Sequence, residues 1–404
     1  MRCWYRLFIV KALFLFRTQS MKYYIIAGER SGDLHASNLI KQLHEQDPQA
    51  HIRCWGGDMM EAAGAELVKH YQEMAFMGFL EAAKNLFKIK RFLKECQDDL
   101  LAFQPDVVIL VDYAGFNMRI AKFAKEHGLK VFYYISPKIW AWNQGRVHTI
   151  KKLVDKMFVI MPFEKDFYQK FDYKTDYVGN PVSDAVAAHQ INPNFRKDNN
   201  LDDRPIIAVL PGSRQQEIEN ILYIMLSILP PFQDYQFVVA AVSNFDREYY
   251  EHFNREPFIK IVYDQTYDIL ANAEAALVTS GTATLETAMF SVPQVVCYRT
   301  SAVSYWIGRA VIKVPYISLV NLIAGRKVVP ELIQGDMNAQ NLVKELKNIL
   351  QNPKGRAAQL DGYKRVQELI GDFNTSQTAA KLMVQYLKEG KTTPDTTKTL
   401  KSVL

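Results

Sequence analysis

Short apolar runs recur along this chain, and each is followed by small or polar residues and then by a stretch with helical periodicity. Apolar runs of about four to eight residues bounded by turn residues indicate buried strands, and longer amphipathic stretches indicate helices. The runs that predict strands span residues 22–27, 105–112, 131–135, 157–161, 206–210, 236–241, 259–263, 275–278 and 294–298. The chain is therefore predicted to be an α/β protein with parallel sheets.

This alternation occurs in both halves of the chain and is interrupted by a polar stretch, residues 186–204, that is rich in Asn, Asp and Pro. We interpret this stretch as a linker. It separates two Rossmann-like α/β domains, residues 21–185 and 205–345, which are expected to face each other across a cleft. C-terminal helices are predicted in residues 346–390, and a polar tail covers residues 391–404.

The first twenty residues are basic and apolar, but they fit a secretory signal peptide poorly. Lys11 interrupts the apolar stretch, and no small-residue cleavage site follows it. Met21 directly precedes the strand-forming run at residues 22–27. We therefore interpret residues 1–20 as a dispensable extension, with Met21 as the first residue that the fold needs.

Composition and charge narrow the class of protein. The chain has 404 residues, of which 49% are hydrophobic and 23% charged, as expected for two globular domains. A formal net charge of +6 suits an anionic ligand or an anionic membrane surface, and by itself it does not indicate nucleic acid. The four cysteines are far apart and form no Cys/His cluster, which argues against a zinc site and fits a reducing compartment. After residue 20 no apolar run is long enough to span a membrane.

The run at residues 275–278 leads through Ser280, Gly281 and Thr282 into a helical pattern that contains Glu286. A strand, a tight turn and a helix N-terminus present free N–H groups and the positive end of a helix dipole, which together attract phosphate. Glu286 lies one turn further along, where it could accept hydrogen bonds from a ribose. An ordinary turn between strand and helix, with hydroxyl capping, explains the same pattern equally well.

Charged residues follow three other predicted strands. Glu29 comes just after the first strand, Asp112 ends the most apolar strand of the first half, and Arg214 follows the first strand of the second half. The carboxyl ends of parallel strands border the usual ligand crevice, and a buried acid there is costly unless it is paired or used. The loop at residues 136–143 adds two tryptophans, one of them Trp140, as in pockets for sugars or acyl chains.

Residues 74–95 contain more bulky apolar residues than one core face needs, interleaved with lysine and arginine. Such a mixture suits a helix that lies on an anionic membrane surface. A core helix with a basic, solvent-exposed face is the alternative, and for this pattern taken alone it is the better supported one.

No Asp-x-Asp triplet occurs in the chain, which disfavours a glycosyltransferase that clamps its nucleotide through such a triplet and a metal. Two facing domains, a phosphate turn and Arg214 instead suggest an enzyme that uses a nucleotide sugar. In such an enzyme the helix N-terminus and the arginine would stabilise the departing diphosphate.

A set of motifs occurs in one order along the chain. The motifs are Gly28-Glu29-x-Ser31-Gly32-Asp33, Val111-Asp112 with Phe116-Asn117, Ser136-Pro137-x-x-Trp140-Ala141-Trp142, Leu210-Pro211-Gly212-Ser213-Arg214, Ser280-Gly281-Thr282-Ala283-Thr284-Leu285-Glu286, and Tyr316-x-Ser318-Leu319-Val320-Asn321-Leu322-Ile323-Ala324-Gly325-Arg326. Together they resemble the lipid-A-disaccharide synthases. The likeness covers roughly residues 22–390. It implies a GT-B fold and an inverting transfer that needs no metal or other cofactor. In the implied reaction UDP-2,3-diacylglucosamine gives its sugar to 2,3-diacylglucosamine 1-phosphate, which yields a β-1,6-linked disaccharide and UDP.

The resemblance also implies roles for individual residues. Asp112 is the candidate general base on the acceptor 6-hydroxyl. The donor is expected to contact Gly212, Ser213, Arg214, Ser280, Gly281, Thr282, Glu286 and Asn321. The acceptor is expected to contact Glu29, Ser31, Gly32, Phe116, Asn117 and Trp140.

Because both implied substrates carry acyl chains, the resemblance strengthens the membrane interpretation of residues 74–95. It implies a cytoplasmic protein that is attached peripherally to the inner membrane, and it is compatible with a homodimer. The expected membrane contacts are Phe76, Met77, Phe79, Phe87, Lys88 and Arg91.

The chain departs from the family pattern at three positions. Arg30 replaces the usual alanine, Gly115 replaces a second aspartate, and Asn180 stands where histidine is common. The glycine leaves Asp112 as the only carboxylate of its loop, which either favours Asp112 as the base or indicates altered acceptor binding.

Two alternative functions stay open on the residues of these motifs. One is another GT-B enzyme, such as a UDP-N-acetylglucosamine transferase or a 2-epimerase, and the other is a non-catalytic protein that binds a UDP-sugar or a lipid.

Overall fold

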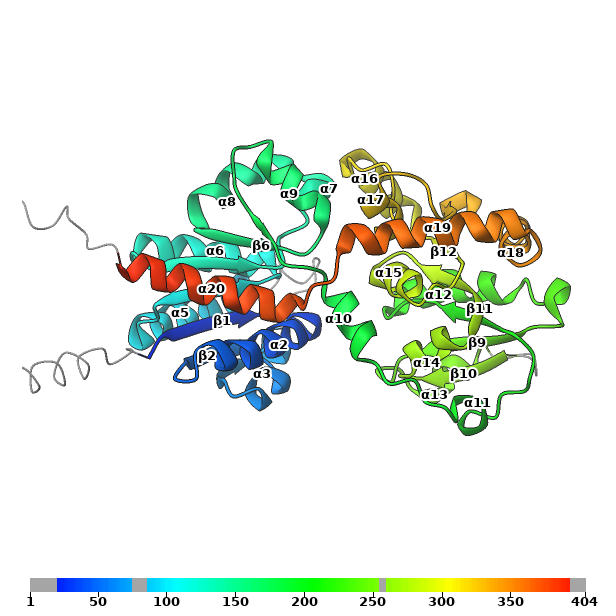
Figure 1. Cartoon of the computed structure of the whole chain (residues 1–404), viewed down its shortest axis with the longest axis horizontal. Helices are drawn as coiled ribbons and strands as arrows, with labels where there is room; N and C mark the ends of the chain where they lie inside the picture. The colour runs from blue at the N-terminus through cyan, green and yellow to red at the C-terminus, as the bar shows by residue number, and fades with distance from the viewer. Residues whose placement is uncertain (1–19, 75–85, 254–258, 393–404) are drawn as a thin grey trace, which may run out of the picture.

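The computed structural model describes residues 20–74, 86–253 and 259–392, which form two α/β domains side by side (Figure 1). The strands of the first domain are β1 (Lys22–Ala27), β2 (His51–Gly56), β3 (Glu66–His70), β4 (Val107–Val111), β5 (Lys130–Tyr134), β6 (Lys156–Val159) and β7 (Asp176–Tyr177). Those of the second are β8 (Ile206–Leu210), β9 (Gln236–Ala241), β10 (Ile259–Tyr263), β11 (Ala273–Thr279), β12 (Gln294–Tyr298) and β13 (Glu331–Ile333).

Helices separate most of these strands along the chain. In the first domain they are α2 (Arg30–Gln46), α3 (Asp58–Ala62), α4 (Tyr71–Met74), α5 (Leu86–Phe103), α6 (Ala114–Glu126), α7 (Ile139–Trp142), η1 (Gln144–Arg146), α8 (Val147–Leu153) and α9 (Pro162–Gln169). Between the two sheets come α10 (Pro181–Ala188) and α11 (Phe195–Asp198). The remaining helices are α12 (Gln215–Leu226), η2 (Pro230–Phe232), α13 (Arg247–Glu251), α14 (Thr266–Ala271), α15 (Thr282–Met289), α16 (Ala302–Val311), α17 (Leu319–Ala324), η3 (Gln334–Asp336), α18 (Ala339–Gln351), α19 (Pro353–Ile370) and α20 (Thr375–Thr392).

Each domain is built on one parallel sheet. The strand order is β3-β2-β1-β4-β5-β6-β7 in the first domain and β10-β9-β8-β11-β12-β13 in the second. In each sheet the order reverses beside the first strand, between β1 and β4 and between β8 and β11. Ligands of open parallel sheets bind at the carboxyl ends of the strands next to such a reversal. The two-domain α/β fold predicted from the repeated apolar runs is therefore confirmed.

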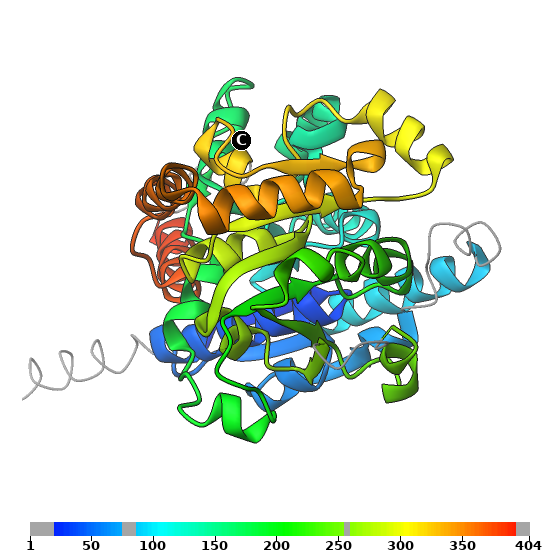
Figure 2. The ribbon, with the colours of Figure 1, turned by 90° about the vertical axis from the view of Figure 1, so that its right-hand side faces the viewer.

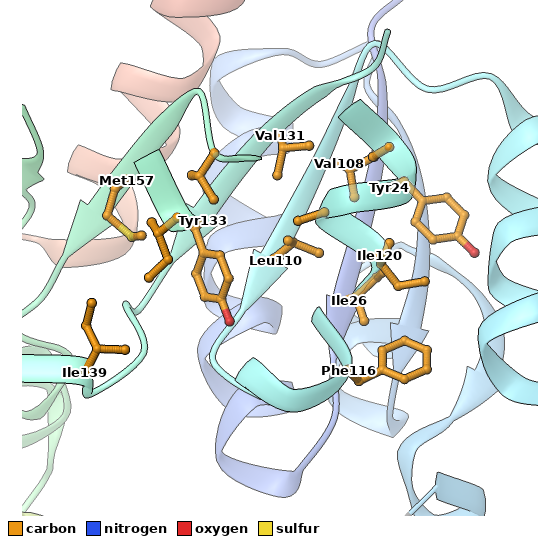
Figure 3. Packing of buried hydrophobic residues seen from close by; sticks show 14 of the residues in the cluster. Tyr24, Ile26, Val108, Leu110, Phe116, Ile120, Val131, Tyr133, Ile139 and Met157 are labelled. Atoms are coloured by element: carbon orange, nitrogen blue, oxygen red, sulfur yellow. The ribbon is translucent and has the colours of Figure 1, made fainter. Parts of the chain in front are cut away.

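The central strands are apolar on both faces because helices cover both faces. All five residues of β4 are buried. Alternate side chains such as Tyr24, Leu110 and Tyr133 point to one face, where they pack against Phe116 and Ile120 of α6 (Figure 3). The residues between them point to the opposite face, where the core includes α2. This packing fixes the strand tips, and with them the start of α6, relative to the sheet.

The second domain is closed on its outer side by α18 and α19. Figure 2 views it from that side, with α18 lying across the front. Leu342, Leu346 and Ile349 of α18 are buried in the core of this domain, and α19 contributes Tyr363 and Val366 to a neighbouring cluster. Both helices therefore belong to the second domain.

The last helix, α20, returns to the first domain and lies along it (Figure 1). Ala380, Met383 and Leu387 are buried in the first-domain core, where α20 packs on α2. The C-terminal helices of residues 346–390 are thus shared between the two domains, because the apolar face of α20 completes the first core. The chain crosses between the domains once after β7 and again between α19 and α20.

The first crossing contains structured elements. Asn180 caps α10, since its Oδ1 accepts the Val182 N–H (3.0 Å) while its Nδ2 donates to the Ile160 carbonyl (3.0 Å). The side chain of Phe195 in α11 is buried in a cluster of the second domain. The two domains also join directly where the Lys313 N–H donates to the Ala141 carbonyl (2.8 Å).

No helix among the described residues is long and apolar enough to cross a membrane. The expected membrane contacts Phe76, Met77 and Phe79 lie outside the described residues, as do residues 1–19 of the expected extension. The other expected contacts lie on α5, whose inner face buries Ile89 and Phe92.

Candidate active site

Asp112 lies at the tip of β4 in a strained stretch of backbone. Asp112 (φ 44°) and Tyr113 (φ 45°) both occupy the left-handed region, which costs on the order of 1 kcal/mol or more for each non-glycine residue. The main chain of Asp112 is held by its neighbours: its N–H donates to the Tyr134 carbonyl (3.2 Å), and its carbonyl accepts from Asn117 Nδ2 (2.8 Å). Strain that is fixed in this way is typical of functional sites.

The environment makes the Asp112 carboxylate more basic than usual. Burial raises its pKa above the ordinary value, while the positive charge of Lys138 and the N–H of Tyr113 partly oppose that rise. Lys138 follows β5, the neighbouring strand, and is the N-cap residue of α7. The sequence offered no signal for Lys138 beyond its place in the loop at residues 136–143.

Glu29 joins this group from the tip of β1. Although the Glu29 side chain is exposed, partial desolvation and the negative charge of Asp112 raise its pKa, while Arg214 and Lys138 lower it. Arg214 comes from the second domain, so its effect on Glu29 acts between the two domains. The structure therefore brings together two carboxylates and one lysine of the first domain and one arginine of the second.

The carboxylate of the other acid near β1, Asp33, caps the N-terminus of a helix. Its carboxylate accepts the N–H groups of Gly57 (2.8 Å), Met59 (3.2 Å) and Met60 (3.2 Å) at the start of α3. Gly32 beside it is buried, and a Cβ there would lie 3.3 Å from the Cβ of Ala27. Glycine thus allows α2 to approach β1 closely, and Ser31 is left exposed at the rim.

Three of the expected acceptor residues have buried side chains. Phe116 packs near the Trp55 ring, with 5.9 Å between centroids. Asn117 donates to the carbonyls of Val111 and Asp112. Trp140 donates from Nε1 to Glu164 (2.9 Å). These three side chains therefore contact other protein groups near the ends of the strands and hold the loops of the site in place.

Glu164, which sequence reasoning missed, organises the loop that carries Lys138. Its carboxylate is fully buried and accepts from Ser136 Oγ (2.5 Å), from Trp140 Nε1 and from the N–H groups of Ile160 and Met161. Burial raises the pKa of Glu164, and these donors oppose that rise. Because a buried carboxylate needs such donors, this acid ties the loop after β5 to the start of α9.

The turn after β11 presents an open helix N-terminus. Gly281 is the N-cap residue of α15 and Thr282 its first residue, and both are exposed. A Cβ at Gly281 would meet no described atom within 4 Å. Ser280 donates its hydroxyl to the Ile317 carbonyl (2.9 Å), which ties the turn to the segment before α17. The N-terminus of α15 can therefore receive an anion.

Glu286 lies in α15 one turn beyond that N-terminus. The hydroxyl of Tyr267 in α14 donates to its Oε1 (3.3 Å). Burial raises the pKa of Glu286, and the hydroxyl opposes the rise. Tyr267 carries no motif in the sequence, so its role as a partner of Glu286 emerges only from the packing of α14 beside α15.

The turn after β8 combines a left-handed glycine with an exposed cation. Gly212 has φ 100°, and a Cβ there would meet the Glu217 side chain at 2.5 Å. Ser213 and Arg214 are exposed, and Arg214 pairs with Glu217 (3.0 Å). Glycine is favoured at this point, since other residues rarely adopt that backbone conformation.

Asn321 differs from the other expected donor residues because it is fully buried. Its Nδ2 donates to the Val329 carbonyl (3.0 Å) and to Glu331 (2.8 Å), while its Oδ1 accepts the N–H groups of Val328 and Val329. These bonds hold the turn between α17 and β13. Its partner Glu331 also accepts the N–H groups of Ile317 and Ser318, so Asn321 supports the segments on both sides of α17.

Two parallel-sheet domains whose charged strand tips face each other define a GT-B type protein. A UDP-GlcNAc 2-epimerase from Neisseria meningitidis bound to UDP-GlcNAc is similar in structure, with a TM-score of 0.63 and 13% identity over 91% of this chain and 100% of that one. The glycotransferase of kitacinnamycin is similar to the same degree, with a TM-score of 0.63 and 12% identity over 91% of this chain and 100% of that one. At this level of identity the likeness shows the fold alone.

Sequence comparison identifies the family within this fold. The model of the lipid-A-disaccharide synthetases matches residues 23–385. The lipid-A-disaccharide synthase of Myxococcus xanthus is 37% identical over 93% of this chain and 100% of its own length, and that of Syntrophus aciditrophicus is 36% identical over 90% and 97%. The chain therefore belongs to the lipid-A-disaccharide synthase family, as the motifs predicted, and it is a glycosyltransferase.

Proposed function

We propose that this protein transfers the diacylated glucosamine of UDP-2,3-diacylglucosamine to the 6-hydroxyl of 2,3-diacylglucosamine 1-phosphate, which gives lipid A disaccharide 1-phosphate and UDP. Family membership carries the proposal, and the convergence of Asp112, Glu29, Lys138 and Arg214 at the cleft supports it. Incubation of the purified protein with both substrates, followed by mass spectrometry, tests it. A disaccharide is expected, whereas an epimerised sugar nucleotide or no turnover would favour the alternatives.

In the proposed mechanism Asp112 acts as general base. A sugar hydroxyl is a poor nucleophile at neutral pH, and inversion in one step needs a base on the face opposite the departing UDP. Asp112 takes the proton of the 6-hydroxyl as the new bond from O6 to C1 forms. The bond from C1 to the diphosphate breaks in the same step, and its electron pair leaves with UDP.

The second domain is proposed to hold the donor. Its diphosphate would lie against the N-terminus of α15, at Ser280, Gly281 and Thr282, with Arg214 neutralising the charge that develops as UDP departs. Glu286 would accept hydrogen bonds from the ribose. Gly212 and Ser213 let the main chain after β8 approach the nucleotide, and Asn321 supports the site from beneath.

The first domain is proposed to hold the acceptor. Glu29, Ser31 and Gly32 border it at the tip of β1. Phe116, Asn117 and Trp140 would act as positioning residues, since their side chains pack behind the loops that carry Asp112 and Lys138.

The pH dependence of the reaction offers a test of these roles. Asp112 must be deprotonated to act as a base, so activity falls as the pH drops below its raised pKa. Lys138 lowers that pKa, so Lys138→Met is expected to move the acid limb of the kcat/KM profile to higher pH. Lys152→Met, on the exposed face of α8, serves as the matched control and should leave the profile unchanged. An acid limb that moves to lower pH, or stays in place, would contradict the assignment.

We also propose that the protein binds peripherally at the cytoplasmic face of the inner membrane through the start of α5. The side chain of Phe87 is 88% exposed there. Lys88 and Arg91 are exposed beside it, and Arg91 also pairs with Glu95 (3.4 Å). An exposed aromatic ring among basic residues suits the boundary between headgroups and acyl chains of an anionic bilayer.

A matched pair of variants on α5 tests this surface. Phe87→Ser combined with Lys88→Gln is expected to reduce co-sedimentation with anionic vesicles severalfold, because the ring and one cation are lost. Leu101→Ser removes another exposed apolar side chain, 44% exposed, near the other end of the helix and should not change it. Equal losses of vesicle binding in both variants would contradict the proposal, as would a lowered melting temperature with unchanged vesicle binding. Either result would favour a core helix whose basic face is exposed to solvent.

A further inference from the structure

An open hollow lies directly beside the Asp112 loop in the first domain. It has a volume of about 320 Å³ and lies between the first turns of α6, the loop before α7 and the face of α8. Its apolar lining comes from Ala114, Met118, Pro137, Ile139 and Ile150. A hollow of this size is large enough for part of a small ligand.

Two arginines, Arg119 of α6 and Arg146 of η1, line the same hollow. Both are exposed, and neither makes an ion pair with any residue in the described part of the chain. The guanidinium of Arg146 lies 5.0 Å from the centroid of the Trp142 ring, which limits its movement. Among the residues that the structure describes, no carboxylate lines the hollow itself. An anionic ligand would therefore find two guanidinium donors in its lining.

The other cations of α6 lie in a different environment. Lys122 pairs with Glu126 (3.9 Å) and Lys125 with Asp155 (2.7 Å). Arg119 thus differs from both lysines in lacking a described acidic partner, although it lies on the same helix. The difference follows from its position, since it faces the hollow next to the loop that carries Asp112.

Gly115 gives the hollow its width on the side of Asp112. A Cβ at this position would meet no described atom within 4 Å, so a larger residue would project into open space. The apolar lining and the two arginines together suit a ligand that combines a phosphate with a hydrocarbon chain. Guanidinium groups bind phosphate through paired hydrogen bonds, and the apolar residues exclude water from a chain.

We infer that this hollow binds the anomeric phosphate of the acceptor between Arg119 and Arg146, with an acyl chain against its apolar lining. This inference rests on the proposed function, which supplies an acylated sugar phosphate whose 6-hydroxyl must reach Asp112. Holding the phosphate beside the base fixes the sugar at both ends. The two arginines then select an acceptor that carries a phosphate over one that lacks it.

Kinetics in neutral detergent micelles, without phospholipid, test the inference. Arg119→Gln and Arg146→Gln are each expected to raise the KM for the phosphorylated acceptor about tenfold, because each removes a charge-assisted hydrogen bond. The kcat and the KM for the UDP-sugar should stay within about twofold. With 2,3-diacylglucosamine, which lacks the phosphate, the variants should match the wild-type protein. Lys122→Gln on the same helix is the control and should change none of these constants.

Several outcomes would overturn the inference. Equal losses with both acceptors would show a structural role for the arginines, and a raised KM for the donor would place the diphosphate in the hollow. An effect that appears only when anionic vesicles are added would assign the arginines to lipid headgroups.

A binding measurement separates this inference from the proposed function. Calorimetric titration with diacylglucosamine 1-phosphate needs no turnover. Weaker binding to the arginine variants than to wild type would support the subsite even if no disaccharide forms, and unchanged binding would refute it even if the disaccharide forms.

Discussion

Replacement of Asp112 by asparagine is expected to lower kcat by about 10²- to 10⁴-fold, which is roughly 3–5 kcal/mol of barrier, because general-base catalysis contributes that much. This substitution removes the basic carboxylate of Asp112 without changing the local structure. Asparagine tolerates the left-handed backbone that Asp112 adopts, and it keeps nearly the same shape. Affinity for UDP should stay near that of the wild-type protein, since the nucleotide is proposed to bind the other domain. Steady-state kinetics and calorimetric titration with UDP measure both quantities.

Asp166→Asn serves as the matched control, because Asp166 is exposed on α9 and the substitution is the same. It should leave kcat unchanged. If Asp112→Asn retains more than about a tenth of the wild-type kcat, well above the range for a lost general base, Asp112 is not the base. Glu29 would then be the next candidate, since the carboxylate of Asp33 is already occupied by three N–H groups of α3.

Removal of the Glu286 carboxylate is expected to raise the KM for the UDP-sugar by about 10- to 150-fold. A hydrogen bond from ribose to a charged acceptor is worth roughly 1.5–3 kcal/mol, and each 1.4 kcal/mol corresponds to about tenfold. The acceptor KM should change much less in Glu286→Ala, because the acceptor is proposed to lie on the first domain. Initial rates with each substrate varied in turn separate the two constants.

Two further variants sharpen this test. Tyr267→Phe removes the hydroxyl that donates to Glu286 (3.3 Å) but keeps the carboxylate, so a smaller rise in the same constant is expected. Glu368→Ala, on the exposed face of α19, removes a glutamate far from the nucleotide and should have no effect. A rise confined to the acceptor KM would mean that the substrates are assigned to the wrong domains.

The sequence by itself determined the central strands of both sheets and the charged residues that follow them, but it did not predict the edge strands β3, β7 and β13. A parallel strand covered on both faces must be apolar along its whole length, so β4 and β8 stand out as unbroken apolar runs. A charged residue within a few positions after such a run has to lie near the carboxyl ends of the strands. That reasoning found Glu29, Asp112 and Arg214 without any knowledge of their partners.

Only the tertiary structure decided what the neighbouring polar residues contact. The motifs predict ligand contact for Asn117, Trp140 and Asn321 as they do for Glu29. The side chains of these three residues are nevertheless buried and hydrogen-bonded to the loops around them. Glu164 lies outside every motif and still fixes the loop that carries Lys138. The partner of a polar side chain depends on which loops meet, and those loops are far apart in sequence.

Contacts between distant parts of the chain also decide where whole helices pack and which charges interact. The sequence predicts C-terminal helices in residues 346–390, but only the shape of the first-domain core decides that α20 packs there and not on the second domain. The influence of Arg214 on Glu29 likewise requires two domains to face each other. Periodicity reports which side of an element is buried. What that side is buried against is set by contacts between distant parts of the chain.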